Sequence, residues 1–86
     1  MVQDGDLVAI FHSIHRVMKA EKVLKQHKAN ILLIPVPRQL TSDCGLAIRM
    51  PAEAREMVWE LLAAEGLLPA ELYQRQQGNY QPQELP

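Results

Sequence analysis

The chain contains a single cysteine, Cys44, in a segment whose residue types suit thiol chemistry. Pro35 and Pro37 precede it and Gly45 follows it directly, which is typical of a shaped loop that holds a side chain at its rim. Because the chain has no second cysteine, Cys44 cannot form an intramolecular disulfide. We therefore expect any chemistry of this protein to be thiol chemistry at Cys44.

Polar residues that could support an ionised thiol occur in two places. Arg38 lies in the same loop as Cys44, and Ser13 stands where it could cap a helix that begins between two histidines. The free N–H groups of a helix N-terminus and a guanidinium both stabilise a thiolate, whereas the neighbouring Asp43 opposes it. The expected supporting, anion-stabilising residues are Arg38, Ser13, His15, His12 and Gly45.

Other interpretations of these residues stay open. A lone cysteine is often only a small buried hydrophobe. His12, His15 and Cys44 could bind a metal, but no acidic fourth ligand is apparent nearby, so we expect neither a metal nor a cofactor. Ser13, His15 and Cys44 could form a hydrolytic triad, but no carboxylate is placed to orient the histidine.

Arg49 is excluded from the expected site because of the strand that carries it. It lies five positions beyond Cys44 in the sequence, on a segment with the alternating pattern of a strand. A strand rises by about 3.3 Å per residue, so the two residues are roughly 15 Å apart.

Hydrophobic patterning predicts the elements that position Cys44. Short apolar runs bounded by turn residues indicate strands, Ser13 marks the start of a helix and Gly66 marks the end of another. The expected order is strand, helix, strand, strand, helix, over residues 7–11, 14–26, 31–34, 46–50 and 51–66.

These elements predict an α+β fold, a two-layer sandwich of βαββα order. A right-handed crossover makes the first two strands parallel, and the third fits antiparallel between them. The result is a three-stranded mixed sheet of order 1-3-2 with two helices on one face, half of a ferredoxin-like arrangement. In this topology the loop that carries Cys44 lies beside the N-terminus of the first helix.

Residues 1–66 are expected to form one α/β domain, followed by a Pro/Gln-rich C-terminal tail over 67–86 that is partly docked or disordered. With both helices on one face, Val8, Ile10 and Trp59 need cover on surfaces that the predicted sheet leaves open. A domain this small also buries little surface by itself. We therefore expect a homodimer or a docked tail.

The charge balance excludes several classes of partner. The formal net charge is −1 at neutral pH, so the electrostatic attraction used by nucleic-acid and anionic-membrane binders is missing. The longest apolar run, Ile31 to Ile34, is too short to cross a bilayer, and no cationic leader precedes it. We expect a cytoplasmic protein with a reduced thiol.

The segments around these residues resemble a family of small proteins described as selenium/sulfur carrier-like. The likeness covers about residues 7–66, and its most specific parts are Pro-x-Pro-Arg at 35–38 and Asp-Cys-Gly at 43–45. The similar segments are Phe11 to His15, Ala20 to Lys22, Ile34 to Arg38 and Ser42 to Arg49.

The resemblance implies that Cys44 receives a sulfur or selenium atom from a donor protein such as a cysteine desulfurase. The atom would be held as a persulfide or selenosulfide and passed to an acceptor protein of unknown identity. Such a protein is a stoichiometric carrier more than an independent enzyme. Two alternatives stay open: a non-catalytic anion-binding or protein-interaction module in which Cys44 only packs, and a single-thiol redox sensor.

Overall fold

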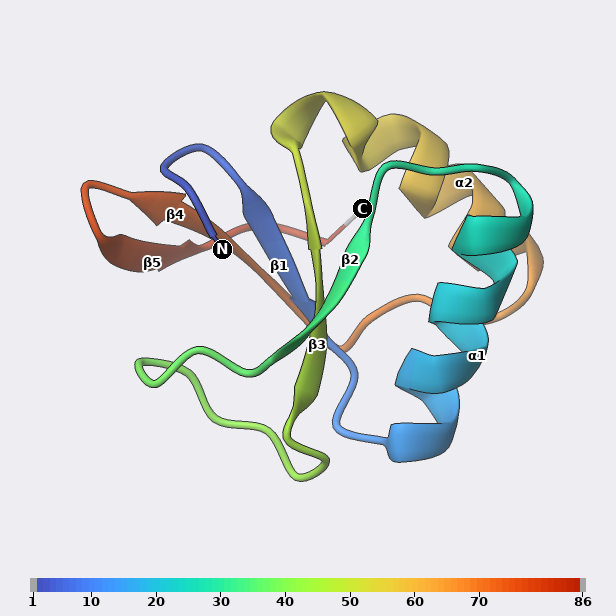
Figure 1. The fold of residues 1–86 in the computed structure, drawn as a ribbon, viewed down its shortest axis with the longest axis horizontal. Coiled ribbons are helices and arrows are strands. Elements are labelled where there is room, and N and C mark those ends of the chain that lie inside the picture. Colours follow the sequence, from blue (N-terminus) through green and yellow to red (C-terminus); the bar gives the residue numbers. More distant parts are fainter. Residues whose placement is uncertain (1, 86) are drawn as a thin grey trace.

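Five strands, two α-helices and one short 3-10 helix make up the fold of residues 2–85, which are the residues that the computed structural model describes. In chain order they are β1 (Leu7–Ile10), α1 (Ile14–Gln26), β2 (Leu32–Pro35), β3 (Leu46–Met50), η1 (Ala52–Ala54), α2 (Arg55–Ala64), β4 (Glu71–Gln76) and β5 (Asn79–Pro82). The two helices pack side by side on one face of the sheet (Figure 1).

The strand order in the sheet is β2-β3-β1-β4-β5, and every neighbouring pair is antiparallel. β1 and β2 run parallel with β3 between them, and β3 and β4 run parallel with β1 between them. Two split βαβ units are therefore interleaved, which is the full ferredoxin-like arrangement. The predicted order 1-3-2 survives inside the larger sheet.

The predicted antiparallel pairing of the third strand with the first two is confirmed, but the sheet is antiparallel throughout and not mixed. The predicted strand number is also wrong, because the segment expected to be a tail supplies β4 and β5. Residues 71–74 of β4 pair with the edge of β1 that a three-stranded sheet would have left bare. Gln77 and Gly78 have φ of 52° and 80° and form the two-residue turn of a hairpin. Pro82 is tolerated because β5 is an edge strand.

The helices bury one stripe each. The Ser13 side chain accepts a hydrogen bond from the Arg16 N–H, which confirms the predicted cap of α1. On α2, Leu62 is buried and Met57 is exposed. The buried positions of η1 and α2 are spaced by four residues. The residues buried on the helices are Val17, Ala20 and Leu24 of α1 and Val58 and Leu62 of α2, with Ala54 of η1.

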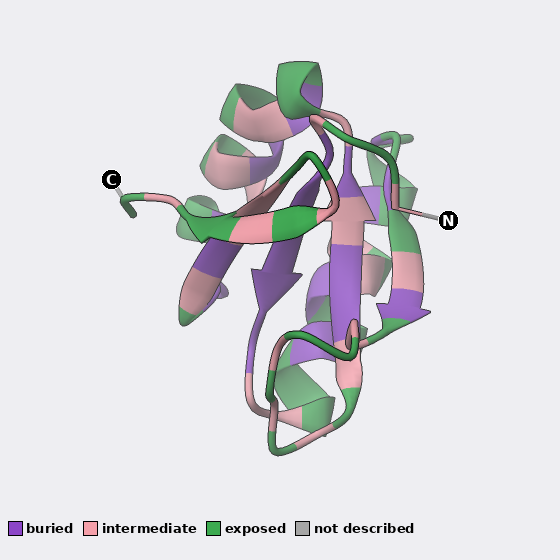
Figure 2. Ribbon diagram, turned by 90° about the vertical axis from the view of Figure 1, so that its left-hand side faces the viewer, coloured by how far each residue is buried: buried purple, intermediate pink, exposed green. Residues whose placement is uncertain are grey.

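The sheet face opposite the helices is covered by the chain itself. Val8, Ile10, Ile34 and Ala47 form a buried cluster on this face, and Figure 2 shows the burial concentrated in the central strands. The residues that pack over the cluster are Val2, Val36, Leu40, Tyr73 and Tyr80. The face therefore needs no second chain to be buried, and the homodimer stays a prediction.

Candidate functional site

Cys44 lies at the end of the loop from β2 to β3, two residues before β3 begins. The Val36 N–H donates to the Gly45 carbonyl at 3.0 Å and closes the base of this loop. Gly45 has φ of 73°, a left-handed conformation that favours glycine. Cys44 is half-buried, so the loop geometry holds the only thiol of the chain partly open to solvent.

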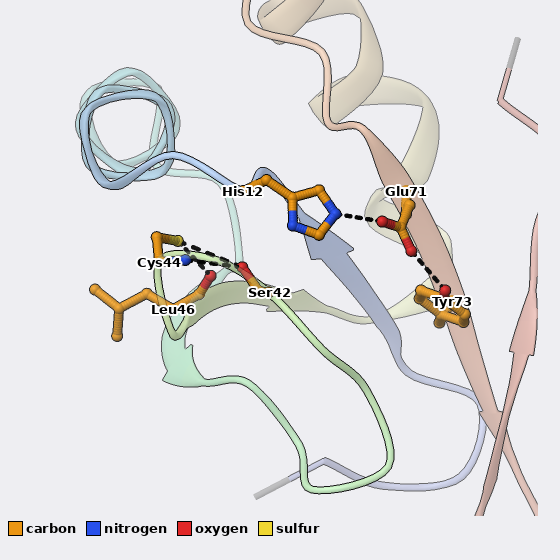
Figure 3. Close-up of polar contacts among 6 residues, drawn as sticks. All are labelled: His12, Ser42, Cys44, Leu46, Glu71 and Tyr73. Carbon is orange, nitrogen blue, oxygen red and sulfur yellow. Dashed lines mark hydrogen bonds and ion pairs between the residues drawn. The ribbon is translucent and has the colours of Figure 1, made fainter.

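The Cys44 thiol has polar contacts within its own turn (Figure 3). Its Sγ donates to the Leu46 carbonyl at 3.4 Å and lies 3.6 Å from the Ser42 Oγ, which also accepts from the Cys44 N–H at 3.3 Å. The side chain also packs against the core between helices and sheet. A thiol that donates to a carbonyl is protonated, and a thiolate at the same place would instead accept from the Ser42 hydroxyl.

The strand register brings three segments together at the end of the sheet where β1 ends and β3 and β4 begin. Ile10, the last residue of β1, pairs with Ala47 on one side and with Glu71 on the other. The Cys44 turn directly precedes Ala47 in the chain, and His12 follows Ile10 by two positions. His12 therefore leaves the sheet between the cysteine turn and the start of β4. The predicted proximity of this loop to the start of α1 agrees with Figures 1 and 3.

The His12 ring is held from one side only. Its Nε2 pairs with the Glu71 carboxylate, as Figure 3 shows. Its Nδ1 is buried and has no hydrogen-bond partner among residues 2–85. In Figure 3 the ring lies between Glu71 on one side and Ser42 and Cys44 on the other. One nitrogen of the ring is therefore fixed and the other is free.

Glu71 is itself held from two sides. The Tyr73 hydroxyl donates to one carboxylate oxygen at 2.6 Å, and His12 contacts the other. The hydrogen bonds from Tyr73 and His12 lower the pKa of Glu71 below its ordinary value of 4.5, although partial burial opposes this. The same contact raises the pKa of Tyr73 above its ordinary value of 10.0. Glu71 is therefore ionised and Tyr73 neutral at neutral pH.

Three other expected site residues make no hydrogen bond with Cys44: Ser13, His15 and Arg38. Ser13 uses its hydroxyl to cap α1, so this oxygen already accepts a hydrogen bond. His15 and Arg38 are exposed. Arg49, which we excluded from the site, lies on β3 and forms an ion pair with the buried Asp6 at 2.9 Å.

Sequence reasoning missed Glu71 and Tyr73, because both lie in the segment expected to be a tail. The alternation of Leu72 with more polar neighbours and the Gln-Gly pair at 77–78 were signals of a strand and a hairpin turn. The described residues contain no group of three or more His, Cys, Asp or Glu side chains that could hold a metal ion. Among residues 2–85 no helix is long and apolar enough to cross a membrane.

Comparison with known proteins gives a family. A model of the family described as "Putative Se/S carrier protein-like" matches residues 6–74, so the chain belongs to this family. The matched range includes Cys44, His12, Glu71 and Tyr73. No curated protein and no solved structure matches the chain.

Proposed function

We propose that this protein carries sulfur or selenium on Cys44, as a persulfide or selenosulfide, and passes the atom to an acceptor protein. The observation that carries this proposal is the state of Cys44: the only thiol of the chain, half-buried at the rim of a closed loop. The family description, which names a Se/S carrier, supports the same function.

A carrier has three chemical requirements. Its thiol must be accessible to a donor protein, and the surrounding groups must stabilise the terminal chalcogen. No neighbouring cysteine may release the chalcogen by forming a disulfide with the carrier cysteine. Partial exposure of Cys44 supports the first requirement. The Ser42 hydroxyl, a possible hydrogen-bond donor beside Sγ, supports the second. The absence of any other cysteine in the sequence meets the third.

In the loading step, Cys44 attacks the outer sulfur of a persulfide on the donor protein. A new S–S bond forms at the Cys44 Sγ, the S–S bond of the donor breaks, and the donor cysteine leaves as a thiolate that takes up a proton. The proton of the Cys44 thiol is released in the same exchange. No external oxidant is needed, because one persulfide replaces another.

The test is the intact mass of the protein after incubation with a cysteine desulfurase and cysteine, without a reductant. We expect one added sulfur atom per chain, removed by a small thiol that releases it as sulfide. The matched control is Cys44→Ser, which should gain no mass. The same incubation with a selenium-loaded donor compares the two chalcogens. Wild-type protein that gains no sulfur or selenium would contradict the carrier function.

The outcome also separates the two alternatives. A redox sensor gains oxygen at Cys44 on exposure to peroxide but takes no sulfur from a persulfide donor. An anion-binding or protein-interaction module gains neither, and its ligand binding is unaffected by Cys44→Ser. The donor and acceptor proteins are proposed as partners in the carrier function alone.

A further inference from the structure

The unpartnered nitrogen of His12 is the polar group that the proposed loading step leaves without a role. The Nδ1 atom is buried and, among residues 2–85, has no hydrogen-bond partner, although a buried ring nitrogen is normally paired. The ring separates Glu71 from the turn that holds Cys44 (Figure 3). No hydrogen bond joins His12 to Cys44 in this state, in which the thiol donates to the Leu46 carbonyl.

Glu71 fixes which nitrogen of His12 can accept a proton. An ionised carboxylate only accepts hydrogen bonds, so the nitrogen that contacts it, Nε2, must carry hydrogen. In the neutral ring the lone pair is then on Nδ1, the nitrogen without a partner. A carboxylate that holds a histidine in this way orients the ring and stabilises its protonated form.

The backbone of His12 supports the same interpretation. Its φ of 59° lies in the left-handed region, which is uncommon for residues other than glycine. The conformation turns the chain from β1 into α1, while the pair with Glu71 fixes the ring at this bend. Observed backbone strain of this kind is more frequent at functional sites than elsewhere.

We propose that His12 is the proton acceptor of the Cys44 thiol, with Glu71 and Tyr73 as positioning residues that hold its ring. The application of this role to sulfur transfer rests on the proposed carrier function. As the thiol leaves Leu46 and its Sγ bonds to the incoming sulfur, its proton moves to Nδ1. The donor cysteine thiolate then takes this proton, so His12 returns to its neutral form and charge is conserved.

The histidine can also act after loading. A chalcogen bonded to Sγ extends about 2 Å beyond the thiol. When the terminal S–H or Se–H of the cargo gives its own proton to the neutral Nδ1, the protonated ring can donate back to the ionised chalcogen. His12 would then accept a proton during loading and stabilise the bound cargo afterwards.

The other charged groups near the Cys44 turn act on its thiol only weakly. The remaining titratable groups on the cysteine loop and on the first turn of α1 are exposed, and the Arg16 guanidinium is directed to the Gly66 carbonyl at 3.0 Å. These exposed groups are Arg38, Asp43, His15 and Arg16. Their interactions with Cys44 are screened by solvent. The group held against the site by hydrogen bonds is the chain of Tyr73, Glu71 and His12.

The test is the rate of Cys44 alkylation by iodoacetamide as a function of pH in the full chain. His12→Gln keeps a polar side chain but cannot take the proton of the thiol, so we expect alkylation at neutral pH to slow about tenfold. The rate should then rise at higher pH. Glu71→Gln and Tyr73→Phe should shift the profile in the same direction by smaller amounts, because His12 remains.

The matched control is His27→Gln, because His27 is an exposed histidine at the C-terminal end of α1, and it should leave the profile unchanged. Far-UV circular dichroism establishes that each variant is folded. If His12→Gln does not fold, Tyr73→Phe provides the decisive profile. A profile that coincides with wild type in the folded variants would overturn the proton-acceptor role.

Alkylation needs no sulfur donor, so this result is independent of the carrier function. Slower alkylation in His12→Gln supports the His12 role even if wild-type protein gains no sulfur. In that case the carrier function fails and the activated thiol remains. If His12→Gln gains sulfur as fast as wild type, His12 has no role in transfer. The carrier function would then remain intact.

Discussion

Glu71 at the start of β4 pairs with the ring of His12 just beyond β1, although the two residues are 59 positions apart in the sequence. The contact exists because β1 and β4 are neighbours in the sheet, with Ile10 paired to Glu71. The contact links the C-terminal hairpin to the end of the sheet where Cys44 lies.

The first prediction concerns the pH dependence of stability that Glu71 causes. Its pKa is lower in the folded state than its ordinary value of 4.5, so its ionised form stabilises the fold above that pH. This stabilisation is lost as the pH falls through the lowered pKa. We expect Glu71→Gln to unfold at lower urea concentration than wild type at neutral pH, and the two to converge in acid, as the pH falls below the lowered pKa of Glu71.

Glu84→Gln is the control for this measurement, because the Glu84 side chain is exposed. It should behave like wild type throughout the titration. A gap between Glu71→Gln and wild type that stays constant into acid would contradict the pKa shift. It would mean that Glu71 contributes through packing and not through its charge.

The second prediction compares two arginines. Arg38 is exposed in the cysteine loop, and solvent screens its charge, so Arg38→Ala should slow Cys44 alkylation by only about twofold. Arg49→Ala should leave alkylation unchanged, because Arg49 lies along β3 and pairs with Asp6. If Arg49→Ala slows alkylation as much as Arg38→Ala or more, Arg49 influences Cys44 in a way that its position on β3 does not explain.

Arg49→Ala should instead affect stability. Burial tends to raise the pKa of Asp6, but the Arg49 and Gln3 hydrogen bonds and the nearby positive charge hold it below its ordinary value of 3.8. Without Arg49 this carboxylate is buried and lacks its main partner, at a cost of about 2 kcal/mol in the free energy of unfolding. Urea denaturation measures this loss, and the double variant Asp6→Asn with Arg49→Ala should recover part of it.

The sequence was sufficient for the parts of the fold that local patterns determine. The Ser13 cap, the extent of α1 and the order of the first three strands follow from residue types and from the handedness of the crossover. The hairpin of β4 and β5 was missed, because prolines and glutamines suggest a tail when the free edge of β1 is not considered. Pairing with that edge is a tertiary effect, which overrides local preference.

The site was predictable to the same extent. Cys44 and its nearness to His12 follow from topology, since both lie at one end of the sheet. The pairing of His12 with Glu71 does not, because it depends on the register of a strand that was not predicted. The exposed positions of His15 and Arg38 depend on helix rotation and loop shape, which residue spacing alone leaves open.

The third prediction concerns the cap of α1. Ser13→Ala removes the oxygen that accepts from the Arg16 N–H at 3.2 Å, so the free energy of unfolding should fall by about 1 kcal/mol. Ser13→Asp, which can also cap, should retain the stability. Urea titrations of the two variants provide the comparison. A Ser13→Ala protein as stable as wild type would mean that the first turn of α1 is held by other contacts.

The last prediction concerns the hairpin and the association state together. Truncation after Gly66 removes β4, which pairs with β1 along its length, and also removes Leu72 from the core. It exposes Val8 and Ile10, since Tyr73 and Tyr80 pack over their cluster. We expect the truncated chain to lose its circular dichroism signal or to aggregate. Light scattering measures the association state of the full chain. A full-length dimer would place an interface on another surface, such as the exposed Met18 of α1 or Met57 of α2, because the sheet face is already covered. A truncated chain that stays folded and monomeric would show that β1 does not need β4, and would remove the hairpin from the structural basis of the site.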